Sequence, residues 1–126
     1  MKKELKFYRF RQSNSGGSFV VDKKVCHEVI VEASNKEEAI EIAMDLGIYF
    51  NGVDDGFDCP CCGDRWYEPY SHIEFPIKWD ENKTFVTIEE YAQFVANEYG
   101  WTKPDIRIFY KNGEVKEIFS SKRELK

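Results

Sequence analysis

The sequence predicts an α+β fold, in which an antiparallel, aromatic-rich sheet of about five strands packs two helices on one face. Three observations carry this prediction: several short alternating segments, two helical repeats that each open with a capping box, and a long cysteine-bearing loop between the helices. A chain of 126 residues has the size of one domain. We therefore expect a single domain over residues 1–126, with a polar, flexible tail at 120–126.

The strands are predicted from segments rich in aromatic or β-branched residues. In residues 25–33 the odd positions form one face, where His27 lies among valines, so we expect His27 to be a core residue. Lys111-Asn112-Gly113 is a strong hairpin turn before the last strand. The expected strands cover residues 5–12, 19–21, 25–33, 106–110 and 114–119.

Each predicted helix has a start signal, an apolar stripe and a glycine stop. The first helix opens with Ser34 and Glu37, which fit a capping box, and it ends at Gly47. In the second helix Thr87 and Glu90 form the box and Gly100 is the stop.

Residues 48–71 form the long loop, and their apolar residues follow neither the helical nor the strand periodicity. The stretch 51–70 contains three glycines and two prolines. A structureless run of this length is uncommon in a compact domain, and its aromatic residues argue against disorder. A bound metal ion is one economical way to fix such a loop.

The segment from Asp58 to Trp66 (Asp-Cys-Pro-Cys-Cys-Gly-Asp-Arg-Trp) is the most informative part of the sequence. Cys59 and Cys62 match the Cys-Pro-x-Cys-Gly pattern of a zinc knuckle, in which two intervening residues let a tight turn aim both thiolates at one ion. A structural zinc requires four ligands, so two more must come from elsewhere. In order of preference the candidates are His72, Cys26 and Cys61.

Two other interpretations of the cysteines stay open. They are unligated thiols that pack as small hydrophobic residues, or redox or nucleophilic groups. The second is less favoured, because the segment lies in a glycine-rich loop and no helical pattern follows it.

Asp64, Arg65, Trp66 and Tyr67 place aromatic side chains beside charges, a composition typical of interface hot spots. It is equally typical of aromatic residues that pack a loop onto the core, so both roles stay open. If the loop is a contact surface, these four residues are its anchors.

The N-terminal segment is basic and suggests a different function. Its cations could combine with Tyr8 and Phe10 to bind single-stranded nucleic acid, and the turn at residues 15–18 could cradle a nucleotide phosphate. A solvated sheet face is the simpler explanation, and the net charge of −5 argues against a dedicated nucleic-acid binder. The basic residues are Lys6, Arg9, Arg11, Lys23 and Lys24.

Three segments together resemble a group of small proteins encoded by tailed bacteriophages. They are Phe7–Phe10 with Ser15–Phe19, then Gly47–Val53, then Asp58–Trp66, and the resemblance covers roughly residues 5–75. It implies an accessory phage protein that acts on host machinery or host defence, in the cytoplasm of the host cell. It implies no activity, and the C-terminal third does not share it.

The leading functional hypothesis is therefore a non-enzymatic protein that occludes or redirects a host protein, with a structural zinc. A nucleic-acid or nucleotide binder is the first alternative. A small metalloenzyme with an open zinc position is the second. The sequence has no apolar run near the ~18 residues of a membrane span and no signal peptide after its first lysines, so a cytoplasmic location is expected.

Overall fold

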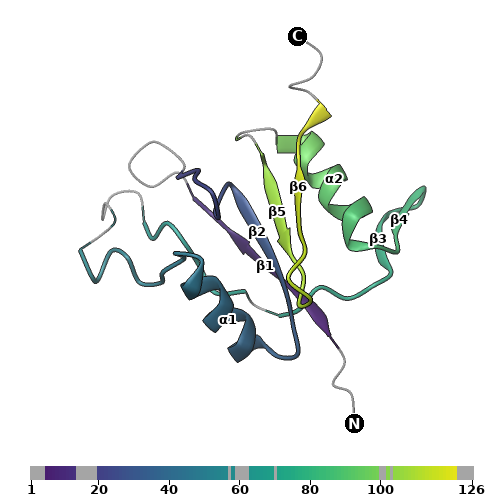
Figure 1. Ribbon diagram of the computed structural model, residues 1–126. Helices are drawn as coiled ribbons and strands as arrows, with labels where there is room; N and C mark the ends of the chain where they lie inside the picture. The colour runs from purple at the N-terminus through teal and green to yellow at the C-terminus, as the bar shows by residue number, and fades with distance from the viewer. Residues whose placement is uncertain are drawn as a thin grey trace.

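The computed structural model describes residues 5–13, 20–56, 58, 63–69, 71–99, 102 and 104–121. It confirms the α+β class, with two helices, a four-stranded sheet and a separate two-stranded hairpin (Figure 1). The elements in chain order are β1 (Lys6–Arg11), β2 (Glu28–Ala33), α1 (Lys36–Asp45), β3 (Ile77–Asp80), β4 (Lys83–Phe85), α2 (Ile88–Tyr99), β5 (Ile106–Phe109) and β6 (Val115–Ile118).

The main sheet is mixed, where an antiparallel sheet was expected. Its order is β1-β2-β5-β6, and the central pair β2 and β5 runs parallel. The pairs at the two sides, β1 with β2 and β5 with β6, are antiparallel. Parallel strands need a crossover connection, and here that connection holds both helices and the β3–β4 hairpin.

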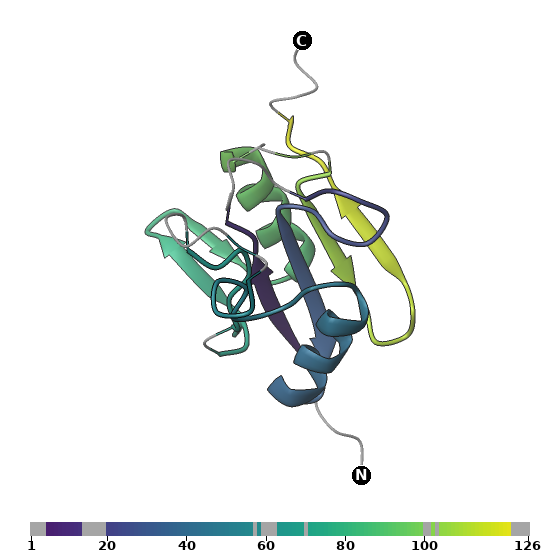
Figure 2. The same ribbon diagram turned by 90° about the vertical axis from the view of Figure 1, so that its left-hand side faces the viewer.

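The helices cover opposite faces of the sheet, which corrects the expectation of one shared face (Figures 1 and 2). Val29 and Val31 pack with Ala39 and Ala43 of α1. Ile30, which points to the other face, packs in a second cluster with residues of α2, β4 and β5. The run Val29-Ile30-Val31 is apolar at consecutive positions, as expected of a strand buried on both faces.

The helix boundaries follow local capping chemistry. At α1 the cap is Asn35, one residue later than expected, and its side chain accepts a hydrogen bond from the backbone of Glu38. Gly47 follows the end of α1 with φ +105°, as expected of a helix stop. At α2 the predicted capping box is confirmed, because Thr87 and Glu90 bond each other's backbone amides. Gly100 lies outside the described residues.

The chain between the helices is more ordered than the sequence suggested. After Trp66 it follows the outer edge of β1, with one bridge from Trp66 to Gln12 and another from Ile73 to Phe7. The β3–β4 hairpin then follows, in a region for which no strand was predicted. Val20 and Val21, expected in a strand, are not in one. Within the described part of the chain, no helix combines the length and the apolar character that crossing a membrane requires.

Candidate functional site

The cysteine-bearing segment is closed at its base by the buried carboxylate of Asp58. Asp58 Oδ2 accepts a hydrogen bond of 2.8 Å from the backbone N–H of Arg65, and Arg65 Nε lies 3.8 Å from Oδ1. The Tyr49 hydroxyl donates to Asp58 Oδ1 at 2.7 Å. Burial, and then this hydrogen bond, raise the pKa of Tyr49. We call Tyr49, Asp58 and Arg65 the neck of the loop.

Gly52 shows how tightly the neck is packed. A Cβ atom at this position would lie 1.9 Å from Asp58 Oδ2 and 2.8 Å from Cε2 of Tyr49. Only a glycine allows the backbone to approach these groups so closely. The sequence around Gly52 gave no indication of this constraint, which depends on a carboxylate six positions later.

Polar contacts also fix the chain just after the cysteines. The Asp64 carboxylate accepts a hydrogen bond from the backbone N–H of Val53. The backbone carbonyl of Asp64 accepts a hydrogen bond from the Ser13 hydroxyl. The Ser13 backbone N–H donates to the Arg65 carbonyl at 2.8 Å. Arg65 Nη1 donates to the Gln12 side chain at 3.0 Å. The expected contact anchors Asp64 and Arg65 therefore make internal bonds that hold the loop on β1.

The two adjacent aromatic residues of the loop have opposite environments. Trp66 is 2% exposed and belongs to the core cluster on the α1 face of the sheet. Tyr67 is 56% exposed. A Cβ at Gly63 would lie 3.2 Å from the Tyr67 hydroxyl, so the ring reaches the end of the cysteine segment. Of the four expected anchors, Tyr67 displays a large side chain on the surface, whereas Trp66 holds the loop on the core.

The predicted metal ligands are only partly visible in the structure. Cys59, Cys62 and Cys61 lie outside the described residues. Cys26 is fully buried, its thiol donates to the Glu28 carbonyl at 3.2 Å, and burial raises its pKa to about 12. A thiol held in its protonated form is a poor zinc ligand, because the thiolate is the species that binds metal.

His72 lies at the other end of β1 from Cys26. Its ring packs against Tyr8 at 6.2 Å between centroids, and its Nε2 is 3.2 Å from a Glu74 carboxylate oxygen. Cys26 instead lies beside Gln12, whose side chain donates to the Cys26 carbonyl. Tyr8 and Gln12 are about 13 Å apart along an extended chain, so the two candidate ligands contact different parts of the N-terminal segment. The described residues contain no cluster of three metal-ligating side chains.

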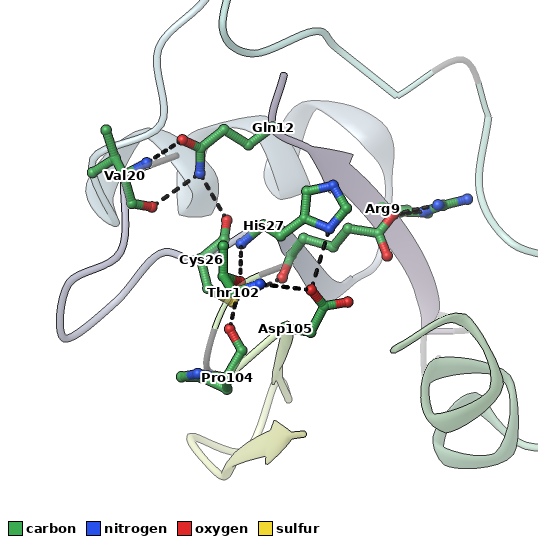
Figure 3. A network of polar contacts seen from close by, with 9 residues as sticks. Arg9, Gln12, Val20, Cys26, His27, Thr102, Pro104 and Asp105 are labelled. Atoms are coloured by element: carbon green, nitrogen blue, oxygen red, sulfur yellow. Dashed lines mark hydrogen bonds and ion pairs between the residues drawn. The ribbon is translucent and has the colours of Figure 1, made fainter. Parts of the chain in front are cut away.

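A buried polar network lies next to the neck (Figure 3). Gln12 connects the two, because its side chain bonds Arg65 on one side and the backbone of Val20 and Cys26 on the other. The backbone N–H of His27 donates to the Thr102 hydroxyl at 3.2 Å, and the hydroxyl donates to the Pro104 carbonyl. This network joins three chain segments that are distant in sequence.

His27 and Asp105 are the titratable pair inside this network. His27 Nδ1 lies 3.5 Å from Asp105 Oδ1, and both residues are fully buried. The expectation that His27 is a core residue is confirmed. Neither side chain is accessible to a substrate in this conformation, so the pair acts as an internal connection. The sequence offered no signal for the partner of His27, because Asp105 is 78 positions away.

Arg9 and Glu28 form an ion pair on the α2 face of the sheet, in which the Glu28 carboxylate is buried. The Arg9 guanidinium bonds the carboxylate of Glu28, which is fully buried, and donates to the Tyr91 hydroxyl at 3.0 Å. This pairing bears on the nucleic-acid hypothesis, because it neutralises one of the predicted phosphate-binding cations. Tyr8 and Phe10, which that alternative would use to stack on bases, are buried in the core. The Gly-Gly turn lies outside the described residues.

A pocket of about 200 Å3 lies between α2, β3 and β1. It is lined by Arg9, Trp79, Tyr91, Phe94, Val95 and Glu98. Trp79 is 52% exposed although its ring packs against Phe94 at 5.0 Å between centroids. This surface was not predicted from the sequence, because no strand was predicted at Trp79.

Comparison with known proteins gives a family and no function. No curated protein and no solved structure matches the chain. A family model described as a domain of unknown function, DUF7296, matches residues 5–125. Because that match includes both sheet edges, both helices and the loop, this chain belongs to the DUF7296 family.

Proposed function

We propose that this protein is a non-enzymatic binding domain that occludes or redirects a host protein, with Tyr67 at the centre of the contact surface. The observation that carries the proposal is the contrast between Trp66, 2% exposed, and Tyr67, 56% exposed. The first residue fixes the backbone to the core, and the second displays an aromatic ring on that fixed backbone. A preorganised exposed aromatic residue is a typical interface hot spot, because binding then orders little of the chain.

Two further features support binding over catalysis. The neck and the contacts of Asp64 tie the loop to itself and to Gln12, just after β1, which favours a preorganised surface for a partner. The histidine–carboxylate pair inside the polar network, His27 with Asp105, is sealed from solvent. The resemblance of residues 5–75 to phage accessory proteins supports a host protein in the cytoplasm as the partner class.

A structural zinc held by Cys59 and Cys62 forms the second part of the proposal. The neck brings the chain back to Asp58 at Arg65, so both cysteines belong to a short closed segment. That closure favours two thiolates that converge on one ion. His72 is the better of the two described candidates for a further ligand, because the Cys26 thiol is fully buried and already donates to the Glu28 carbonyl. Zinc in such a site would act by fixing the loop.

The binding proposal is tested by capture from host extract with the wild-type protein, Tyr67→Ala and Val115→Ala. Val115 is also exposed, but it lies in β6 at the opposite edge of the sheet from β1. We expect one host protein to be retained stoichiometrically by the wild type and by Val115→Ala, and at least tenfold less by Tyr67→Ala at an unchanged melting temperature. The captured protein must then bind in purified form with the same order of affinities. Equal retention by all three proteins, or no specific retention, would contradict the proposal.

The zinc proposal has a separate test in the metal content of the purified protein by elemental mass spectrometry. We expect about one zinc per chain, lost in the Cys59→Ser/Cys62→Ser double variant and retained in Cys26→Ala. Loss of zinc in His72→Asn would identify His72 as a ligand. A wild-type protein that carries no zinc, even when it is purified from zinc-supplemented medium under reducing conditions, would rule out the knuckle.

A further inference from the structure

The loop that presents Tyr67 carries most of the net charge of the chain. Residues 48–71 contain five carboxylates and one arginine, a net charge of −4, whereas the whole chain has a net charge of −5. The rest of the chain is therefore close to neutral, and the negative charge is concentrated in this loop. Its acidic residues are Asp54, Asp55, Asp58, Asp64 and Glu68.

Three of these carboxylates already have partners inside the protein. Asp58 belongs to the neck, and the Asp64 carboxylate accepts a backbone hydrogen bond. Glu68 lies 3.6 Å from a lysine ammonium group. Asp54 and Asp55 are exposed, and their carboxylates make no hydrogen bond or ion pair with the described residues. Two negative charges of the loop are therefore left uncompensated in the part of the chain that the structure describes.

The acidic turn, residues 51–56, is held close to the Tyr67 ring and contains both of these charges. Two backbone hydrogen bonds inside the turn fix its shape, and one of its backbone N–H groups donates to the Asp64 carboxylate. The Tyr67 hydroxyl approaches Gly63, the residue before Asp64. Ring and turn therefore contact two consecutive residues of the chain, and one partner can reach both.

The Tyr67 ring itself has no partner among the described residues. It is 56% exposed, and within the described ranges it makes no aromatic or cation contact. Faces of aromatic rings attract cations, and arginine is the more frequent of the two basic side chains in such contacts. The guanidinium group also stacks on aromatic rings and pairs with carboxylates. An unoccupied aromatic face and two uncompensated carboxylates therefore favour the same positively charged group.

We propose that the Tyr67 surface binds a basic patch on the host protein, in which an arginine side chain stacks on the Tyr67 ring and neighbouring cations face Asp54 and Asp55. This inference rests on the proposed function, because it names the chemistry of the partner at the same surface. Complementary charge of this kind mainly raises the association rate and selects among partners. A partner with an acidic surface is repelled.

The test is a titration of full-length protein labelled with 15N and with 13C in the tyrosine rings, and it needs no host protein. The probes are capped pentapeptides in which glycine alternates with two copies of arginine, citrulline or glutamate. Citrulline keeps the planar shape of arginine without its charge. We expect saturable shifts of the Tyr67 ring with the arginine peptide, at least tenfold weaker binding of the citrulline peptide, and no binding of the glutamate peptide.

Three variants connect the binding to this surface. Asp54→Asn/Asp55→Asn removes both charges at nearly constant shape and is expected to weaken arginine binding about three- to tenfold, an effect that should shrink at high salt. Glu81→Gln/Glu114→Gln is the matched control, because it removes two exposed carboxylates outside the loop, and it should leave binding within about twofold. Tyr67→Leu keeps an apolar side chain without the ring and is expected to weaken binding at least threefold.

Three results would overturn the inference. Equal binding of the arginine and citrulline peptides would mean that the surface does not select charge. Equal losses in the two double variants would assign the effect to the net charge of the protein. The absence of any shift of the Tyr67 ring at about 100-fold molar excess would mean that the surface binds no arginine. In each case the capture test with Tyr67→Ala can still succeed, so failure of this inference is distinct from failure of the proposed function.

Discussion

Replacement of Trp66 by alanine should destabilise the fold, because the structure makes this side chain a core anchor. Trp66 is 2% exposed and packs in the same cluster as Tyr8, Phe10 and Ile48. A buried aromatic side chain covers about 150–250 Å2, which corresponds to roughly 4–6 kcal/mol of transfer free energy at 25 cal/mol per Å2. Measured losses for tryptophan-to-alanine changes in cores are about 3–5 kcal/mol, and we expect a loss in that range.

The assay is urea unfolding followed by far-ultraviolet circular dichroism, since tryptophan fluorescence would lose a reporter in the variant. For a chain of this size the loss corresponds to a fall in melting temperature of roughly 10–25 °C. Tyr67→Ala is the matched control, one position along and 56% exposed, and it should change the free energy of unfolding by about 0.5 kcal/mol or less.

The reasoning fails if Trp66→Ala unfolds at the same urea concentration as the wild type. It also fails if Tyr67→Ala is equally destabilised, because the contrast between the two neighbours would then have no energetic counterpart. A smaller slope of the unfolding free energy against urea would indicate a change in the unfolded or native ensemble, and the loss would then have to be confirmed by calorimetry.

Three further predictions concern buried polar groups. Arg9→Met should lower the free energy of unfolding by about 3–5 kcal/mol, because Glu28 is left buried without its charge partner. The double variant Arg9→Met/Glu28→Leu should recover most of this loss in the same urea assay. Gly52→Ala should lower the melting temperature markedly through the clash with Asp58, and Gly52→Ala/Asp58→Ala should relieve the clash but keep the loss of the neck. The free energy of unfolding should fall as pH rises from about 9 to 12, because the Cys26 thiol ionises near 9.0 when exposed but near 12 in the fold. A thiol reagent at pH 8 should modify Cys26 only when the protein unfolds. In the Cys59→Ser/Cys61→Ser/Cys62→Ser variant Cys26 is the remaining cysteine, so mass spectrometry reports its modification alone.

The sequence predicted those features that depend on local chemistry. The capping box of Thr87 and Glu90, the stop at Gly47 and the burial of His27 are properties of neighbouring residues, and all three are confirmed. The α+β class followed from the same local patterns. These signals depend on residues that are a few positions apart, so they are less sensitive to tertiary packing.

The missed features depend on groups that are distant in sequence. The parallel pairing of β2 with β5 and the position of the two helices on opposite faces both depend on contacts across the sheet, and no local pattern specifies them. The role of Asp58 is set by Gly52, Tyr49 and Arg65 together, which only the folded chain brings into contact. The run Val29-Ile30-Val31 is apolar at three consecutive positions, and this pattern is typical of a strand that is buried on both faces.

The β2–β5 pairing also constrains how the chain is made. On the ribosome, β2 emerges with β1 available for one of its edges, while β5, the partner for its other edge, follows about 80 residues later. At synthesis rates of 5–20 residues per second, that edge waits about 4–16 s for β5. A fragment that stops before residue 106 would keep this edge of β2 exposed permanently. The N-terminal part that carries the cysteine loop is therefore expected to be aggregation-prone when produced alone.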